Sequence, residues 1–267
     1  MLDYANADAE NSAFDVDSSA FRTFKRTAIA GRIVLHPAAT ENGWTLHGGA
    51  SFRYRTKSDA GFDFRNRQRP ATNIPGRIIS TLRIGDSDVF TGIEFAALKD
   101  GFWTAAEYGV SLVNCSTCAD DPVIGGGYIE AGWMIGGNRN LKGGRFDGPT
   151  ISNKKIGTVE FVLRFDTIEL NGANIAGGDY PTLICGVDWW PTDLLRFGVN
   201  RFHLNADLGA TGAGLDPAFA DAIAVSVREE NVTGVTLRAQ FDVCNLTIEL
   251  VSGSKFPQIY STLHRFN

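Results

Sequence analysis

The sequence predicts an all-β fold in which long antiparallel strands form a barrel of the kind that crosses membranes. Apolar and polar residues alternate with a period of two: Val159, Phe161 and Leu163 share one strand face, whereas Glu160 and Arg164 lie on the other. Many such segments have ten or more residues, close to the roughly 9–11 that a tilted strand needs to cross a bilayer. Aromatic residues gather at segment ends and arginines on the polar face, which is typical of interfacial girdles and a water-filled interior.

Eleven segments show this pattern, with turn residues between them. The expected strands are 24–36, 45–57, 62–70, 76–84, 88–98, 102–113, 125–135, 156–170, 181–190, 194–205 and 232–243. Tight turns are expected at Lys99–Gly101 and Pro191–Asp193, whereas Ala206–Asn231 is a long loop rich in Gly and Ala. Short turns at one end and long loops at the other are typical of a transmembrane barrel. Helical periodicity is confined to short pieces such as Pro217–Val225.

Composition and charge exclude several classes of protein. Lys and Arg total 25 against 30 Asp and Glu, and the net charge of −5 argues against a protein whose whole surface binds nucleic acid. No apolar run approaches the roughly 20 residues of a spanning helix. Residues 1–21 form an acidic segment, interpreted as an N-terminal extension or a loop remnant, without a signal-peptide pattern. The sequence therefore excludes a helical membrane protein, but not a membrane β-barrel.

Motifs for catalysis or metal binding are missing from the sequence. Cys115 and Cys118 form a lone CxxC pair and the histidines show no ligand spacing, so we expect a loop disulfide or two free thiols in place of a metal site. Nucleophile-elbow, zinc-protease and phosphate-loop motifs do not occur. Glu94, Glu107 and Glu160 stand on strand faces, where pairing with arginines explains them as well as acid–base catalysis would. We expect neither an enzyme nor a cofactor.

The most distinctive local feature is a stripe of basic residues between positions 51 and 70. Its members form two groups of three, and within each group the basic residues are two positions apart: Arg53, Arg55 and Lys57, then Arg65, Arg67 and Arg69. Residues two apart on a strand lie about 6–7 Å from each other on one face. If the two strands are adjacent and antiparallel, the triplets form a ladder, with Phe52 and Tyr54 on the lipid side. Guanidinium donors suit phosphate oxygens, and a series of moderate sites lets an anion pass without being trapped.

Two other interpretations of the stripe are open from the residues alone. It could be the solvated basic face of a soluble sheet. It could also be a nucleic-acid patch, but the stripe lacks aromatic residues of the same parity as the cations, on which bases would stack. We therefore expect no nucleic-acid partner.

Seven segments form a pattern when they are taken in order: 65–70 (RNRQRP), 101–108 (GFWTAAEY), 125–137 (GGGYIEAGWMIGG), 157–166 (GTVEFVLRFD), 186–191 (GVDWWP), 195–200 (LRFGVN) and 235–242 (VTLRAQFD). Together they resemble the phosphate-selective porins, the O/P type of outer-membrane channel. Each motif alone has low specificity, but together they follow the family's order over residues 22–243.

This resemblance implies a sixteen-stranded, trimeric porin barrel in a Gram-negative outer membrane, which passes phosphate, polyphosphate or related anions along an arginine ladder. The ladder role is carried over to Arg65, Arg67 and Arg69, and parity adds Arg53, Arg55 and Lys57. In this family some loops fold into the lumen. Residues 138–155 contain Arg139, Lys142 and Arg145 and are a candidate second basic element, or else a solvated loop.

The sequence also departs from the family pattern. About ten of sixteen strands are expected, so the chain resembles the C-terminal two-thirds of such a porin, with two open edges that lipid does not tolerate. Residues 244–267 match nothing in the family and are interpreted as an extension. The competing hypotheses are a soluble or periplasmic β-sandwich that binds anionic glycans, and a barrel piece without transport. In a porin the Phe/Leu/Val face forms an external belt with arginines inside, and in a sandwich that face forms the core.

Overall fold

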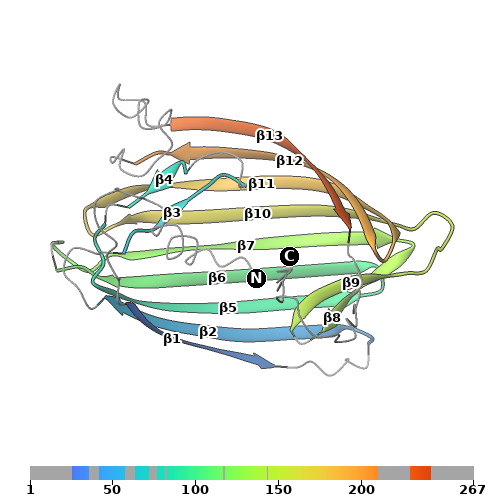
Figure 1. The fold of residues 1–267 in the computed structure, drawn as a ribbon, viewed down its shortest axis with the longest axis horizontal. Helices are drawn as coiled ribbons and strands as arrows, with labels where there is room; N and C mark the ends of the chain where they lie inside the picture. The colour runs from blue at the N-terminus through green and yellow to red at the C-terminus, as the bar shows by residue number, and fades with distance from the viewer. Residues whose placement is uncertain are drawn as a thin grey trace, which may run out of the picture.

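The structure, a computed structural model, describes residues 26–35, 42–57, 64–71, 77–81, 83–116, 118–142, 144–209 and 229–241. Nine strands form one antiparallel sheet in the order β1-β2-β5-β6-β7-β10-β11-β12-β13 (Figure 1). They are β1 (Arg26–Leu35), β2 (Thr45–Lys57), β5 (Ser87–Lys99), β6 (Phe102–Asn114), β7 (Val123–Ile135), β10 (Thr158–Gly172), β11 (Ile175–Thr192), β12 (Leu195–Asp207) and β13 (Glu229–Phe241). This confirms the predicted all-β fold and nine of the eleven expected strands.

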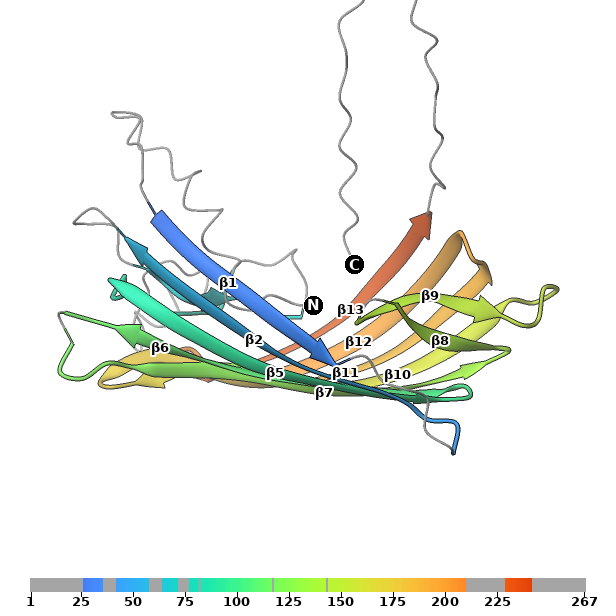
Figure 2. The same ribbon diagram turned by 90° about the horizontal axis from the view of Figure 1, so that it is seen from below.

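The sheet is strongly curved and resembles a trough, with β1 and β13 at its two rims (Figure 2). Each strand pairs with its neighbour along the sheet, and in the described residues β1 and β13 each pair on one side only. The described strands therefore form an open part of a barrel wall. The concave side is called the inner face below, and the convex side the outer face.

The outer face is the apolar one. Exposed large apolar residues, one from each strand, are Ile29, Phe52, Ile93, Tyr108, Trp133, Phe161, Leu183, Val199 and Leu237. A continuous exposed apolar surface that extends over nine strands is found where a protein contacts lipid or another protein. The belt is interrupted towards the ends of β12 and β13, where Arg201, His203 and Asn205 are exposed. A sandwich requires this face to be buried against a second sheet, which the described residues do not provide.

The connections only partly follow the expected division between short turns and long loops. The tight turns after Lys99 and Thr192 lie at one end of the sheet, and the connection of residues 208–228 lies at the other, as predicted. A tight turn at Ala173 and Asn174, both with positive φ, lies at the second end as well. Two left-handed residues give the turn the twist that a two-residue hairpin needs.

Two chain segments lie inside the trough. The first, called the inward segment (described residues 64–71, 77–81 and 83–86), contains β3 (Arg67–Gln68) paired with β4 (Ile79–Ser80). The second is a hairpin of β8 (Gly137–Lys142) and β9 (Arg145–Ile151) at the opposite end (Figures 1 and 2). Of the predicted strands 62–70 and 76–84, only the two-residue strands β3 and β4 form, and they pair with each other and not with the main sheet. Thr81 N also donates to Asn66 O at 2.7 Å.

Apolar clusters attach both segments to the inner face. Ile78 and Ile79 of the inward segment pack with Ile168, Tyr180 and other residues near one end of the sheet. The aromatic and aliphatic side chains of the hairpin pack against Trp103, Met134 and Trp190 near the other end. Charged residues lie between these clusters, as Glu94 and Glu107 do, and also beside them, since Asp88 is in register with Val113 and Glu160 with Met134.

Cys115 and Cys118 form a disulfide in the connection between β6 and β7, in agreement with one of the two expectations for this pair. In the described part of the chain, no helix is long and apolar enough to span a bilayer. The expected segments 1–21 and 244–267 and the helical pattern at Pro217–Val225 lie outside the described residues.

Candidate functional site

The basic row of β2 lies on the inner face, opposite acidic residues of β5. Arg55 is the register partner of Asp88, and its Nε donates to both carboxylate oxygens of Asp88 at 2.8 Å. Arg53 Nη2 lies 3.8 Å from Asp88 Oδ2. The Asp88 side chain is fully buried, so two guanidinium groups share one buried carboxylate.

The last member of this row lies at the rim of the sheet. Lys57 pairs with Asp86, which precedes β5. Hydrogen bonds from the Lys57 ammonium and from Ser116 lower the pKa of the Asp86 carboxyl to about 2. The whole β2 row is thus matched by acids that the sequence analysis did not identify. One signal was available, because Asp86 and Asp88 share a parity at the start of an expected strand.

Arg65, Arg67 and Arg69 lie on the inward segment and not on a strand next to β2. The neighbours of β2 are β1 and β5, so the expected ladder on two adjacent strands is wrong in its geometry. One residue of each triplet nevertheless faces the same space, because Arg53 and Arg67 both line a pocket of about 400 Å³ on the inner face. Asn66, between Arg65 and Arg67, is buried inside the trough.

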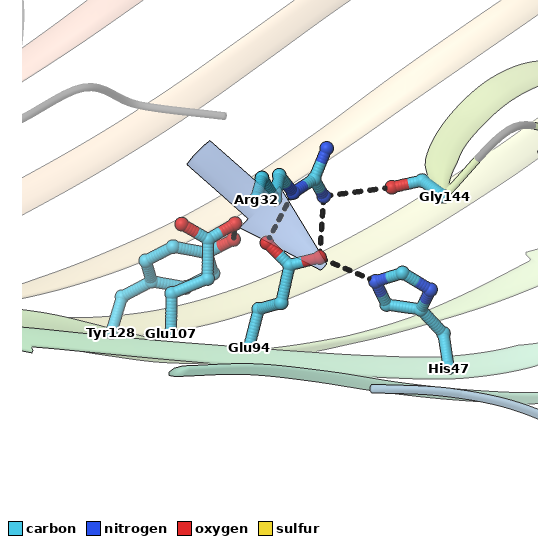
Figure 3. A network of polar contacts seen from close by, with 6 residues as sticks. All are labelled: Arg32, His47, Glu94, Glu107, Tyr128 and Gly144. Carbon is cyan, nitrogen blue, oxygen red and sulfur yellow. Dashed lines mark hydrogen bonds and ion pairs between the residues drawn. The ribbon is translucent and has the colours of Figure 1, made fainter. Parts of the chain in front are cut away.

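A second charged group connects three strands and the hairpin (Figure 3). Glu94 on β5 pairs with Arg32 of β1, whose Nε donates to Oε2 at 3.0 Å, and with His47 Nε2 of β2 at 2.7 Å. Arg32 also donates to the carbonyl oxygen of Gly144, in the turn of the hairpin, at 3.2 Å. The hairpin turn is therefore held against the β1–β2 side of the trough.

The next strands continue the charged zone. Glu107 lies directly opposite Glu94, a like-charge pair that is destabilising unless each member has a partner. Tyr128 donates to Glu107 at 2.8 Å, next to the Glu94 group in Figure 3. Arg164 bridges Glu130 and Asp166 at 3.2 and 2.7 Å, and its guanidinium carbon lies 3.7 Å from the centre of the Tyr128 ring.

The expected basic loop of residues 138–155 is largely the β8–β9 hairpin. Arg139 donates through Nε and Nη2 to the two oxygens of Glu160 at 2.7 and 2.8 Å, and Trp103 Nε1 donates to Glu160 at 2.8 Å. The Arg139 guanidinium also lies within 6 Å of the rings of Trp103, Phe146 and Trp190. It attaches the base of the hairpin to the inner face, whereas Lys142 and Arg145 are exposed.

Glu94 and Glu160, suggested by sequence to pair with arginines, do so with Arg32 and Arg139. Within the described residues, no group of three or more His, Cys, Asp or Glu is placed to hold a metal ion.

Comparison with known proteins agrees with this geometry. The family of phosphate-selective porins O and P matches residues 11–242. This chain belongs to that porin family. It is also similar to an uncharacterized protein of Caulobacter vibrioides, with 31% identity over 182 residues. That alignment covers 64% of this chain and 36% of the relative, so the aligned part amounts to about a third of the relative's length.

Family membership confirms the resemblance seen in the sequence. It identifies the trough as part of a porin barrel, and the family itself is one of channels and not of enzymes. In such a barrel the apolar outer face contacts lipid and the charged inner face borders the lumen.

Proposed function

We propose that the chain forms part of the wall of an outer-membrane channel, through which phosphate, polyphosphate and related small anions diffuse past the basic residues of the inner face. The observation that carries the proposal is the division of the sheet into an apolar outer face and an inner face with rows of arginines. A soluble anion-binding sandwich would have the opposite arrangement.

The proposed anion path follows Arg53, Arg55 and Lys57 on β2, and Arg65, Arg67 and Arg69 on the inward segment. The β2 residues are paired with Asp86 and Asp88, so a passing anion competes with a fixed carboxylate for the same donors. Such competition keeps each site shallow, and conduction requires sites that an ion can leave. Lys142 and Arg145, exposed on the hairpin, form a second basic element along the path.

The complete channel is proposed to be a sixteen-stranded homotrimer in contact with outer-membrane lipid. The family match and the limited share of the relative that the chain covers support this larger assembly. In the described residues the edges of β1 and β13 each pair on one side only. Open edges are not stable in lipid, so further strands or chains must cover them.

The test is the anion/cation permeability ratio of the complete channel in planar bilayers, with phosphate titrated against chloride. We expect anion-selective steps that phosphate blocks, and a weaker anion preference when Arg65, Arg67 and Arg69 are replaced by Ala. Arg201→Ala is the matched control, because Arg201 lies on the outer face, and it should leave the ratio unchanged. An unchanged ratio in the triple variant would remove the proposed path.

A further inference from the structure

The pocket beside Arg53 and Arg67 has an unusual floor. Across β5, β6 and β7 the residues in register on the inner face are Gly92, Gly109 and Gly126. Because these residues carry no side chain, neighbouring groups approach the backbone of the row closely. A Cβ atom on Gly109 would lie only 2.5 Å from Phe90 Cζ, and one on Gly92 3.2 Å from the same ring, so the Phe90 ring lies over these two glycines.

The two sides of the pocket differ in chemistry. Towards the inward segment it is lined by Phe90, Ile124, Ile168 and Leu170, which are apolar. Arg53 and Arg67 line it as well, and the Arg53 guanidinium carbon lies 5.5 Å from the centre of the Phe90 ring. The pocket therefore offers an apolar surface next to groups that bind anions.

The side-chain amide of Asn66 is the observation that points to a bound ligand. Its backbone is fixed to Thr81, because Asn66 N donates to Thr81 Oγ1 at 2.9 Å and Thr81 N donates to Asn66 O at 2.7 Å. Its side chain lines the pocket, the residue is 8% exposed, and Nδ2 makes no hydrogen bond within the described residues. Buried donors are nearly always paired, so an unpaired one at a pocket indicates a missing acceptor.

We infer that this pocket binds a small organic anion with an apolar ring, whose anionic oxygens accept a hydrogen bond from Asn66 Nδ2 between Arg53 and Arg67. The ring lies against Phe90 above the glycine row. The inference rests on the proposed function only in placing the pocket in the lumen, since it names a ligand class that inorganic phosphate does not represent.

The experiment is equilibrium binding of phenyl phosphate and inorganic phosphate to the purified protein in detergent, by titration calorimetry. We expect phenyl phosphate to bind about tenfold or more tightly, because its ring is buried. Asn66→Leu should weaken binding of both anions by roughly tenfold, as expected for loss of a hydrogen bond to a charged group. Phe90→Leu should weaken phenyl phosphate binding and leave inorganic phosphate unchanged.

Asn205→Leu is the matched control, because Asn205 is exposed on the outer face, and it should change neither affinity. If Asn66→Leu fails to fold, Asn66→Asp tests the same donor, since a carboxylate of equal size repels the anion. Equal affinity for the two phosphates, or unchanged binding in the Asn66 variants, would overturn the inference.

Conductance of the complete channel, measured in planar bilayers, separates this result from the proposed function. Anion-selective steps without preference for phenyl phosphate would leave the channel proposal standing and overturn the pocket. Ring-dependent binding that requires Asn66, without anion-selective steps, would support the pocket and contradict the channel.

Discussion

Asp88 offers the sharpest test of how the inner face is stabilised. Its carboxylate is fully buried, accepts from Arg55 Nε at 2.8 Å to each oxygen, and lies 3.3 Å from Ser111 Oγ and 3.8 Å from Arg53. Asp88→Asn keeps the shape but removes the charge between two arginines. Removing one partner of a buried ion pair costs about 3–5 kcal/mol, so we expect the free energy of unfolding to fall by about that amount.

The assay is urea unfolding of the protein refolded into lipid vesicles, followed by tryptophan fluorescence. In bilayers, the same variant should increase the anion/cation permeability ratio, because Arg53 and Arg55 lose the carboxylate they share. Asp193→Asn, in an exposed turn between β11 and β12, is the control and should change neither quantity. Unfolding within about 0.5 kcal/mol of wild type, the range for surface substitutions, would refute the reasoning.

Three further predictions concern other parts of the sheet. Glu160→Gln should loosen the β8–β9 hairpin, because Arg139 loses its charged partner, and limited proteolysis should then cut the hairpin faster than in wild type. Leu163→Arg, at an outer-face position 54% exposed, should destabilise the protein in vesicles by about 2–4 kcal/mol if the site lies at the bilayer midplane; equal stability would argue against lipid contact there. The pKa of Asp86 is about 2, below its ordinary value, so the Lys57 pairing stabilises the fold above about pH 4 and is lost as pH falls towards 2. The difference in unfolding midpoint between wild type and Asp86→Asn should therefore disappear over that range, and a difference that persists at pH 2 would contradict it.

Alternation was enough to predict the main strands and their two faces. Residues 45–57 and 158–166 show a clear period of two, and the structure places their apolar residues outside and their charged residues inside. The same signal failed for residues 62–70. Arg65, Arg67 and Arg69 alternate with other residues as on a strand, but periodicity does not say which partner a segment pairs with.

The acids of the site could not be assigned from the sequence because their partners depend on register. Asp88 meets Arg55 only because β2 pairs with β5, whereas the described residues between them, 64–71, 77–81 and 83–86, lie outside the main sheet. The hairpin was also missed, although the two glycines at 143–144 mark its turn. Gly144 has a φ of +75°, a conformation that glycine adopts at low cost.

The disulfide between Cys115 and Cys118 depends on the redox conditions of the compartment that holds the protein. Such bonds persist in oxidising compartments and are rare where thiols are kept reduced. For a chain exported to the outer membrane, as proposed above, the bond closes after the chain has left the cytosol, while Cys185 keeps its free thiol. On that proposal, the oxidation state of this single loop distinguishes exported molecules from those retained at their place of synthesis.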